Sequence, residues 1–554
     1  MNFKNLVIGI GSFAIMLFLL FVVLFFFKLN TTVSDFSGSD LTTNNQIFYN
    51  FFHGRPFQIT IHTEDPKQYI NPYPYLNAMT AHAWFLGVPF VALFYIIWPG
   101  INTMYAVFII FNFFGFAFFT YKIIKQLSPE DVYLKWLLAF SIFLLSGILR
   151  QILFLGYVLL LSGPAMLAAY YFLISDKKTE FFISIVSLCL IQDDLAVFAI
   201  LFLIALFISD KKYRKTVYPS LIFCLGYFVL WNFIIQPLLR YDLVLVGSKI
   251  SVTFFSRINE MIGGFQLWRF TPKTILTVFS SIYLPGLVAV ILYRSFGVLR
   301  RPPWPKMLAL LFIAPAAYWI YGGYCLGSYH IYPVLPMAYL SFLIFLSCVN
   351  FDWKKKMTKR SFVILFAVVG IFLAVNILVM APVLPYQLRS CVWKIVKKTT
   401  GVEVFQKNEL QEQIPSNKAT IKIVRAILSD RSVCFWGNFI IGGFISDRND
   451  FWIFPMCYDL ADYLVIQKDA LFCHFTAEDL KDLDYKKPGL QYKLDGDLCA
   501  RKVVSGQLVD KLKEDLVSNK QTHRIVRDDK YVLVLERVKR HKFYIPKSSM
   551  GLGW

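Results

Sequence analysis

The sequence predicts a mainly α-helical, polytopic transmembrane protein that ends in a small α/β domain outside the membrane. Of its 554 residues, 57% are hydrophobic and only 16% are charged, whereas a soluble protein carries about a quarter charged residues. Long apolar runs recur along the chain, and about 20 such residues cross a bilayer core of about 30 Å. The basic residues cluster in short loops between these runs, as the positive-inside rule describes.

The apolar runs predict about eleven spans arranged as a helical bundle within residues 1–386. The first run is too long for the apolar part of a cleavable signal peptide, so we interpret it as a signal anchor. The expected spans lie near 6–28, 78–98, 101–122, 134–150, 152–174, 181–208, 217–237, 274–296, 307–327, 330–349 and 361–385.

The basic cluster Lys354–Arg360 sets the expected orientation. It belongs inside the cytoplasm, so the last span exits, and both the first loop (29–77) and everything after 386 lie outside. The expected location is the cytoplasmic (inner) membrane. The net charge of +21 follows this loop bias, and we expect no nucleic-acid partner.

One region conflicts with that orientation. Two lysine pairs, Lys122 with Lys125 and Lys177 with Lys178, would lie outside if all eleven segments cross. The run 181–208 is long for one span and is broken by Gln192-Asp193-Asp194. A hairpin there would change the direction of every segment before it.

The tail, 387–554, is expected to be an extracytoplasmic α/β domain large enough for its own core. Hydrophobic patterning predicts helices at Val402–Ile414, Ala419–Leu428 and Gln507–Val517. Short runs rich in β-branched and aromatic residues predict strands at Ser432–Trp436, Tyr463–Gln467 and Tyr531–Leu535.

The first loop is the strongest candidate for a functional site. Carboxylates, imidazoles and a guanidinium there are mixed with aromatic residues, which is typical of a site rather than of a solvated loop. For the two aspartates the alternative is that they solvate or cap a helix end. The candidates are Asp35, Asp40, Gln46, His53, Arg55 and, just after the loop, His82.

Two further groups lie in or next to apolar segments. Asp193 and Asp194 interrupt a span, where an aspartate costs about 2.5–3.5 kcal/mol on insertion scales, so a functional role is favoured. The alternative is the tip of a hairpin at the interface. His330 and Tyr332 begin the tenth span on the expected outer face, where tyrosine is common in any case.

Several spaced motifs occur in a fixed order between about residue 30 and 470. They are Asp40-Leu41-xxxx-Gln46, Phe52-His53-Gly54-Arg55-Pro56-Phe57, His82, Asp193-Asp194-Leu195-Ala196, Tyr329-His330-xx-Pro333-xx-Pro336 and Ser446-Asp447-Arg448…Phe454-Pro455…Ala461-Asp462-Tyr463. Together they resemble the bacterial and archaeal membrane-protein family called domain-of-unknown-function family 2079. Two departures are Gln192-Asp193, where Lys-Glu is common in that family, and Gly156-Tyr157, where Asp-Phe-His is often found.

That family in turn resembles the GT-C class of membrane glycosyltransferases. The resemblance implies transfer of a sugar from a polyprenyl-phosphate donor to an extracytoplasmic acceptor. Asp40 would be the general base, with Asp35 as its alternate. The implied substrate-binding set is Gln46, His53, Arg55, His82, His330, Tyr332, Asp193 and Asp194. Within this set Arg55, His82 and His330 would neutralise the donor phosphate, and Asp193 or Asp194 would organise the site or hold a cation.

Two other functions stay open. A transporter or lipid flippase would use Asp193 and Asp194 at mid-membrane as a coupling or substrate site. A non-enzymatic assembly protein would act through its tail. The nine cysteines show no metal-ligand spacing, no cofactor is indicated, and a divalent cation is left open. The expected partners are a lipid-linked sugar and membrane lipids; the sequence does not indicate an oligomeric state.

Overall fold

The computed structural model divides the chain into two compact units, which are described separately. The helical unit comprises Met1–Phe27, His82–Leu238 and Ser251–Leu384, and the tail unit comprises Lys28–Ala81, Leu239–Ile250 and Pro385–Trp554. The structure describes residues 2–30, 38–55, 57–59, 76–77, 85–97, 101–145, 158–235, 284–299, 305–313, 334–356, 358–380, 398, 414–437, 441, 445–446, 448, 450–453, 461–468, 509–510 and 512–540.

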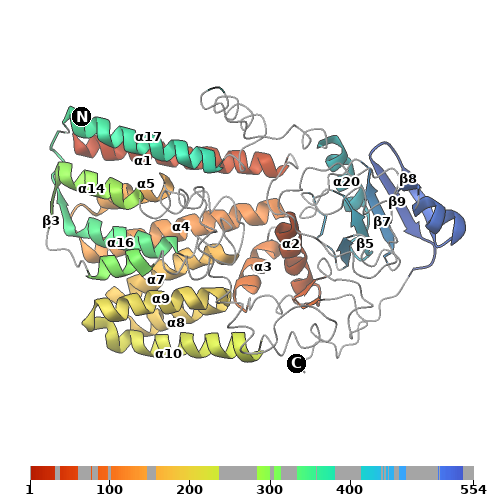
Figure 1. The fold of residues 1–554 in the computed structure, drawn as a ribbon, viewed down its shortest axis with the longest axis horizontal. Helices are drawn as coiled ribbons and strands as arrows, with labels where there is room; N and C mark the ends of the chain where they lie inside the picture. The colour runs from red at the N-terminus through yellow and green to blue at the C-terminus, as the bar shows by residue number, and fades with distance from the viewer. Residues whose placement is uncertain are drawn as a thin grey trace. The chain divides into compact units, whose positions relative to one another are not determined.

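The helical unit is built from helices that pack side by side, with one two-stranded ribbon (Figure 1). Helices α8, α9 and α10 pack against each other, and α7 packs against both α4 and α8. Its elements are α1 (Phe3–Asn30), α3 (Gly87–Ile97), α4 (Ile101–Leu127), α5 (Val132–Leu145), η3 (Val158–Leu161), α7 (Ser162–Ile174), α8 (Lys178–Ile191), α9 (Asp194–Ser209), η4 (Lys211–Tyr213), α10 (Arg214–Leu230), η5 (Trp231–Ile235), α14 (Leu284–Phe296), β3 (Gly297–Leu299), a helical turn at 305–313, α16 (Leu335–Cys348), β4 (Val349–Phe351) and α17 (Lys359–Met380).

The run 181–208 is a helical hairpin and not one span. Gln192 adopts an extended backbone (φ −159°, ψ 142°) that ends α8, and α9 begins at Asp194. Asp176, before α8, and Asp210, after α9, both act electrostatically on Tyr213, so the two helices run in opposite directions. The single-span expectation is therefore wrong, and the hairpin alternative is confirmed.

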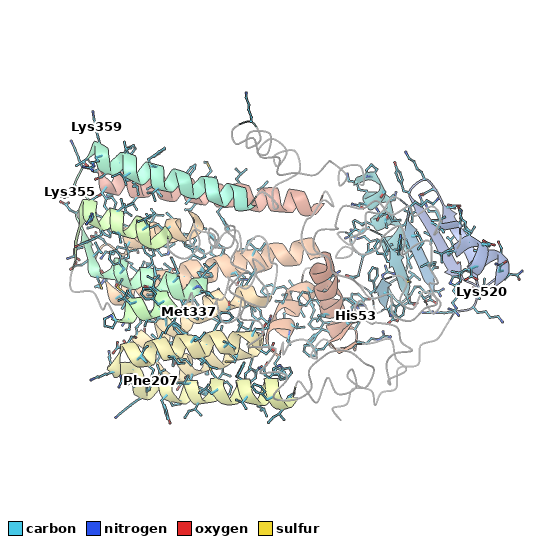
Figure 2. The ribbon with its side chains drawn as sticks, viewed as in Figure 1. His53, Phe207, Met337, Lys355, Lys359 and Lys520 are labelled. Carbon is cyan, nitrogen blue, oxygen red and sulfur yellow. The ribbon has the colours of Figure 1, made fainter. Side chains whose placement is uncertain are left out.

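The hairpin brings the basic loops to one end of the helical unit, which we call the basic end. The Trp353 indole donates a hydrogen bond to Asp131 (2.6 Å), and the Lys306 ammonium lies 2.9 Å from Asp210. Figure 2 shows Lys355 and Lys359 at this end. Because Lys177 is the N-cap residue of α8 and Lys178 is its first residue, the hairpin places both lysines at this end too. The conflict with the positive-inside rule therefore disappears.

Helix α3 does not cross the helical unit. Its 11 residues rise only about 16 Å. The Leu86 amide, just before it, donates to the Leu190 carbonyl near the end of α8 (2.8 Å), away from the basic end. Helix α4 begins four positions after the end of α3 and runs about 40 Å toward that end. Both ends of α3 therefore lie away from the basic end, and a full crossing at 78–98 is not what the described residues form.

The described surface indicates a membrane location. Large apolar side chains are exposed along α1, α10 and α17, for example Val23, Ile222 and Phe366, as lipid-facing helices require. Among the described residues, two stretches are long and apolar enough to span a bilayer, Phe3–Leu20 and Lys211–Ile235, with six shorter apolar helices besides. The expected number of eleven spans is not confirmed.

The tail unit contains a five-stranded mixed sheet in the order β6-β5-β7-β9-β8, with β5 parallel to both β6 and β7 and with β9 antiparallel to β7 and β8. The three expected strands are confirmed, and β6 and β8 are additional. The expected helix at 402–414 lies outside the described residues except for its last residue. Its elements are α20 (Ile414–Ala426), β5 (Val433–Trp436), β6 (Phe451–Ile453), β7 (Tyr463–Gln467), η10 (Lys513–Asn519), β8 (His523–Asp528) and β9 (Val532–Arg537).

Part of the first loop belongs to the tail unit. This part forms helix α2 (Gly38–Phe52) and a short ribbon of β1 (Gln58–Ile59) and β2 (Leu76–Asn77). The domain boundaries expected from the sequence placed this loop, 29–77, within the transmembrane domain. In the structure its residues contact the tail and belong to the tail unit. The loop that carries the candidate base is thus packed with residues some 400 positions away in sequence, as the contact between Asn45 and Ser446 illustrates.

Candidate functional site

The hairpin tip, Gln192–Asp194, holds the candidate acidic pair of the helical unit. Asp193 and Gln192 are buried, and Asp194 is half-buried. The Gln192 side-chain amide donates to the Asp194 carboxylate (3.0 Å). The backbone turns tightly here, because the Leu195 and Ala196 amides donate to the Gln192 and Asp193 carbonyls at 3.0 Å. The two carboxylates therefore have different surroundings.

The tip lies in the half of the helical unit far from the basic end. The 14 residues of α8 and 16 of α9 rise about 21 and 24 Å. A bilayer core measures about 30 Å. Measured from the basic end, the tip therefore stops about 6–9 Å short of the opposite surface of such a core. At this depth the tip lies between the midplane of the core and its far surface.

Helix ends help to stabilise the carboxylates of the tip, of which Asp193 is buried. Asp194 is the first residue of α9 and Asp193 precedes it, and the start of α3 is held at the end of α8 by the Leu86–Leu190 hydrogen bond. The N-terminus of a helix carries a partial positive charge, worth typically 0.3–1 kcal/mol for a nearby anion. Two such ends meet at the tip, which offsets part of the cost of burying Asp193.

Aromatic residues from the end of α10 lie at the level of the tip. The 17 residues of α10 rise about 26 Å, close to the length of α9, so Trp231 directly after it is level with the tip. The Trp231 ring packs edge-on against Phe85 (centroids 5.3 Å apart), and Tyr227 interacts electrostatically with Asp193. The chain forms a π-helical turn over Trp231–Ile235, a conformation that is frequent at functional sites.

Sequence analysis did not single out Tyr227 and Trp231. The signal that was available is the Trp231-Asn232 pair, a polar amide and an indole inside an otherwise apolar run. Aromatic residues are abundant in this chain, so the pair alone carries little information. Their significance comes from the hairpin, which sets the depth of the acidic pair beside them.

The second half of α2 carries polar side chains that are buried. Gln46 and Asn50 are fully buried, as is Asn45, whose side-chain amide donates to the Ser446 hydroxyl (3.3 Å). Gln46 is thus part of the packing between α2 and the tail. Asp40 is the third residue of α2.

The motif His53-Gly54-Arg55 forms the turn that ends α2. The His53 and Arg55 amides both donate to the Asn50 carbonyl (3.1 and 3.0 Å), and Gly54 has a φ of +77°, which favours glycine. His53 stacks on Tyr49 and its Nδ1 lies 2.7 Å from the Tyr49 carbonyl. The His53-Gly54-Arg55 motif therefore has a structural role in ending α2, in addition to any role in binding substrate.

Arg55 pairs with an aspartate of the tail. Its Nη1 donates to Asp450 Oδ1 at 2.6 Å, with 19% of the Arg55 side chain and 9% of the Asp450 side chain exposed. A guanidinium whose charge is already neutralised in this way is less suited to bind a donor phosphate. The position of Arg55 instead indicates that it fastens the first loop to the tail.

The tail residues of the family-like motif also have structural contacts. The buried Arg448 guanidinium donates to three carbonyls, of Val424, Arg431 and Ile445, at 2.8–3.4 Å. Asp462 accepts from the Ser432 amide (3.1 Å), and the Ser432 hydroxyl accepts from the Asp462 amide (2.7 Å). These contacts join the strand ends of the sheet to α20, which is a fold-maintaining role.

The remaining candidate residues cannot be assembled with these. Asp35, His82, His330 and Tyr332 lie outside the described residues. Gln46, His53 and Arg55 belong to the tail unit, and Asp193 and Asp194 belong to the helical unit. In the part of the chain that the structure describes, no three His, Cys, Asp or Glu side chains form a group that could hold a metal. The divalent cation therefore stays a prediction.

Comparison with known proteins finds similar solved structures but no matching family. No protein-family model matches the chain, so the resemblance to domain-of-unknown-function family 2079 is not confirmed, and no curated protein matches it. One similar structure is the arabinofuranosyltransferase AftD from mycobacteria, at 11% identity and a TM-score of 0.43 over 91% of this chain. The other is the Archaeoglobus fulgidus oligosaccharyltransferase, at 12% identity and a TM-score of 0.36 over 81% of this chain and 68% of that one.

The chain spans 40% of the length of AftD. Both TM-scores lie below 0.5, so neither likeness establishes a shared fold.

Proposed function

We propose that this chain is a membrane glycosyltransferase that moves a sugar from a polyprenyl-phosphate donor to an acceptor outside the cytoplasm. The observation that carries the proposal is the hairpin tip: buried Asp193 lies in the helical unit far from every basic loop of that unit's described part. Ionisable residues at such a depth are generally functional. A carboxylate there, beside aromatic residues, suits a polar headgroup delivered by a lipid.

The orientation follows from the positive-inside rule. The basic end faces the cytoplasm, so the hairpin tip opens toward the opposite side. Helix α1 starts at the basic end, where Asn2 bridges to Lys356, and its 28 residues rise about 42 Å. The first loop that follows it is then extracytoplasmic, and so is the tail unit with which the loop packs.

The reaction requires a base, a donor site and a departing phosphate. In the proposal, Asp40, or Asp35 as its alternate, removes the proton of the acceptor hydroxyl. The acceptor oxygen then bonds to the anomeric carbon, the bond from that carbon to the phosphate oxygen breaks, and polyprenyl phosphate leaves. His82 and His330 are the proposed cationic partners of the phosphate. Arg55, because of its ion pair with Asp450, positions the loop rather than the phosphate.

Transport of a lipid is the second candidate, favoured by the break between α8 and α9. Secondary transporters use such discontinuous helices, but near the midplane and between repeated halves. The tip lies about 21–24 Å from the basic end by helix length, which in a core of about 30 Å is as far from the midplane as from the opposite surface. The sequence shows no internal repeat that would supply two such halves, and for this reason we favour transfer over transport.

The test uses purified full-length protein in nanodiscs and in liposomes. Radiolabelled polyprenyl-phosphate sugars of several kinds are supplied together with a panel of hydroxyl-bearing acceptors, and both transfer of the sugar and movement of the lipid between leaflets are followed. A transferase releases polyprenyl phosphate from one sugar lipid and does not need two leaflets to do so. Leaflet exchange without sugar release would instead establish transport. The variant Asp193→Asn tests the role of the hairpin tip in the same assay. Its matched control is Asp176→Asn, at the exposed turn before α8.

A further inference from the structure

The polar groups around the hairpin tip point to a particular chemical class of ligand. Two of them, the Trp231 indole N–H and the Tyr227 hydroxyl, are buried and make no hydrogen bond within the structure as described. Trp231 as a whole is only 1% exposed. An unmade hydrogen bond on a buried group costs about 1–3 kcal/mol, so their retention at this depth calls for an explanation.

The fold places both groups at the same end of the helical unit as Asp193. Tyr227 and Trp231 are four residues apart and so lie on the same side of the end of α10. Tyr227 interacts with the Asp193 carboxylate, and Trp231 packs against Phe85, which directly precedes the Leu86–Leu190 contact at the end of α8. The indole donates only, the phenol donates or accepts, and the carboxylate accepts.

The local charge distinguishes between two ligand classes. The segments that meet here, 85–97, 187–197 and 227–235, contain no lysine or arginine, and their only charges are Asp193 and Asp194. A phosphate would be repelled by these carboxylates and would find no cation in these segments to pair with. A neutral polyhydroxylated ring fits, because its hydroxyl oxygens can accept from the indole and the phenol, which have no hydrogen-bond partner among the described residues, while a ring hydroxyl donates to the carboxylate and the C–H face packs on the aromatic rings.

We infer that Trp231, Tyr227 and Asp193 form a subsite for the sugar ring of the lipid-linked substrate, separate from the groups that take its phosphate. This inference rests on the proposed function and specifies which side chains recognise the sugar. The indole and phenol donate to ring hydroxyl oxygens, and the Asp193 carboxylate accepts from a ring hydroxyl. The subsite contributes binding and orientation, and no bond is made or broken by these three residues.

The experiment measures binding of polyprenyl-phosphate sugars and of bare polyprenyl phosphate to full-length protein in nanodiscs. The variants are Tyr227→Phe, which removes the hydroxyl and keeps the ring, and Trp231→Phe, which removes the indole N–H and leaves a smaller aromatic ring. Tyr218→Phe, on the exposed face of the same helix near the basic end, is the control. Comparing the two lipids within each variant cancels any general loss of stability or of lipid affinity.

The expected result is that each variant binds the preferred sugar lipid about 3- to 10-fold more weakly, which corresponds to the loss of one net hydrogen bond. Affinity for bare polyprenyl phosphate stays unchanged, and the control binds both lipids as wild type does. Equal weakening for both lipids, or none, would overturn the sugar subsite while leaving the transferase intact. A wild-type protein that prefers no sugar lipid over bare phosphate would contradict the proposed function itself.

Discussion

Replacing Asp450 by asparagine tests whether the first loop and the tail form one unit. The substitution keeps the size of the side chain and removes the charge that faces Arg55 at 2.6 Å. The backbone of Asp450 also accepts a hydrogen bond from the Val433 amide (3.1 Å), and asparagine preserves that contact with β5. The perturbation is therefore centred on the charge of Asp450 and leaves its backbone contact with β5 in place.

The magnitude follows from the burial of the two partners. Removing one partner of a fully buried pair costs 3–5 kcal/mol, and a hydrogen bond to a charged group contributes about 1.5–3 kcal/mol. Because one fifth of the Arg55 side chain is exposed, water stabilises part of the charge left behind. We expect a loss of about 2 kcal/mol, which is a factor of about 30 in the local opening equilibrium.

Hydrogen exchange of the full-length protein in nanodiscs measures that equilibrium. In Asp450→Asn, the amides of His53 and Arg55, which donate to the Asn50 carbonyl, should exchange about 30-fold faster. Amides of α9 in the helical unit should be unaffected. The matched control is Asp528→Asn, which breaks more exposed ion pairs with Lys468 and Lys513 in the same unit.

Unchanged exchange at the end of α2 in Asp450→Asn would refute the coupling of loop and tail. The same conclusion would follow if Asp528→Asn accelerated exchange there equally, since the effect would then be a general destabilisation of the tail. Restoration of slow exchange by the charge-swapped pair Arg55→Asp with Asp450→Arg would support a direct electrostatic contact.

Three other predictions concern packing, pH and orientation. The sulfur atoms of Cys189 and Cys224 lie 3.4 Å apart between α8 and α10, so these two cysteines should form an intramolecular disulfide under mild oxidation. If mass spectrometry finds no disulfide-linked peptide and both thiols open to alkylation, the hairpin packing is contradicted. Burial, with the positive Arg537 and Lys520 nearby, lowers the pKa of His523 to about 4, so the unfolded chain binds a proton below pH 6.5 that the folded tail rejects. Folding stability of the tail should therefore fall by about 2 kcal/mol between pH 6.5 and 4, as thermal unfolding across pH would detect, and His523→Gln should remove this fall. Finally, a cysteine at the exposed Ile525 should react with an impermeant maleimide on intact cells, whereas Ser209→Cys at the basic end should not; the reverse pattern would invert the orientation.

Composition and local patterning were sufficient for much of the fold. The helices and the strands β5, β7 and β9 follow from long apolar runs and from short β-branched runs, which depend on neighbouring residues only. Strand β8 was missed because five of its six residues are not buried and it lacks an apolar face. The hairpin was left as an alternative, since a length of 28 residues fits one tilted span as well as two short helices.

The candidate sites depended on contacts that no local pattern contains. Arg55 was assigned to a phosphate because a guanidinium in a polar loop binds anions in general; its partner Asp450 is 395 residues away. Asp193 was selected from the sequence because an acidic residue in an apolar run is costly wherever it lies, and the structure buries it at the hairpin tip. Trp231 could not be selected among twelve tryptophans until the fold placed it at the depth of the tip.

Release of polyprenyl phosphate from a sugar-loaded lipid, compared between wild type, Asp40→Asn and Asp35→Asn, tests the central claim most directly. Loss of a general base lowers turnover by about 10²–10⁴-fold. The account predicts such a loss in Asp40→Asn with donor binding retained, and turnover within a fewfold of wild type in Asp35→Asn. Wild-type turnover in Asp40→Asn, with or without a loss in Asp35→Asn, would contradict the assignment of Asp40 as the base. If wild type released no sugar from any lipid in the panel, the transferase itself would be contradicted.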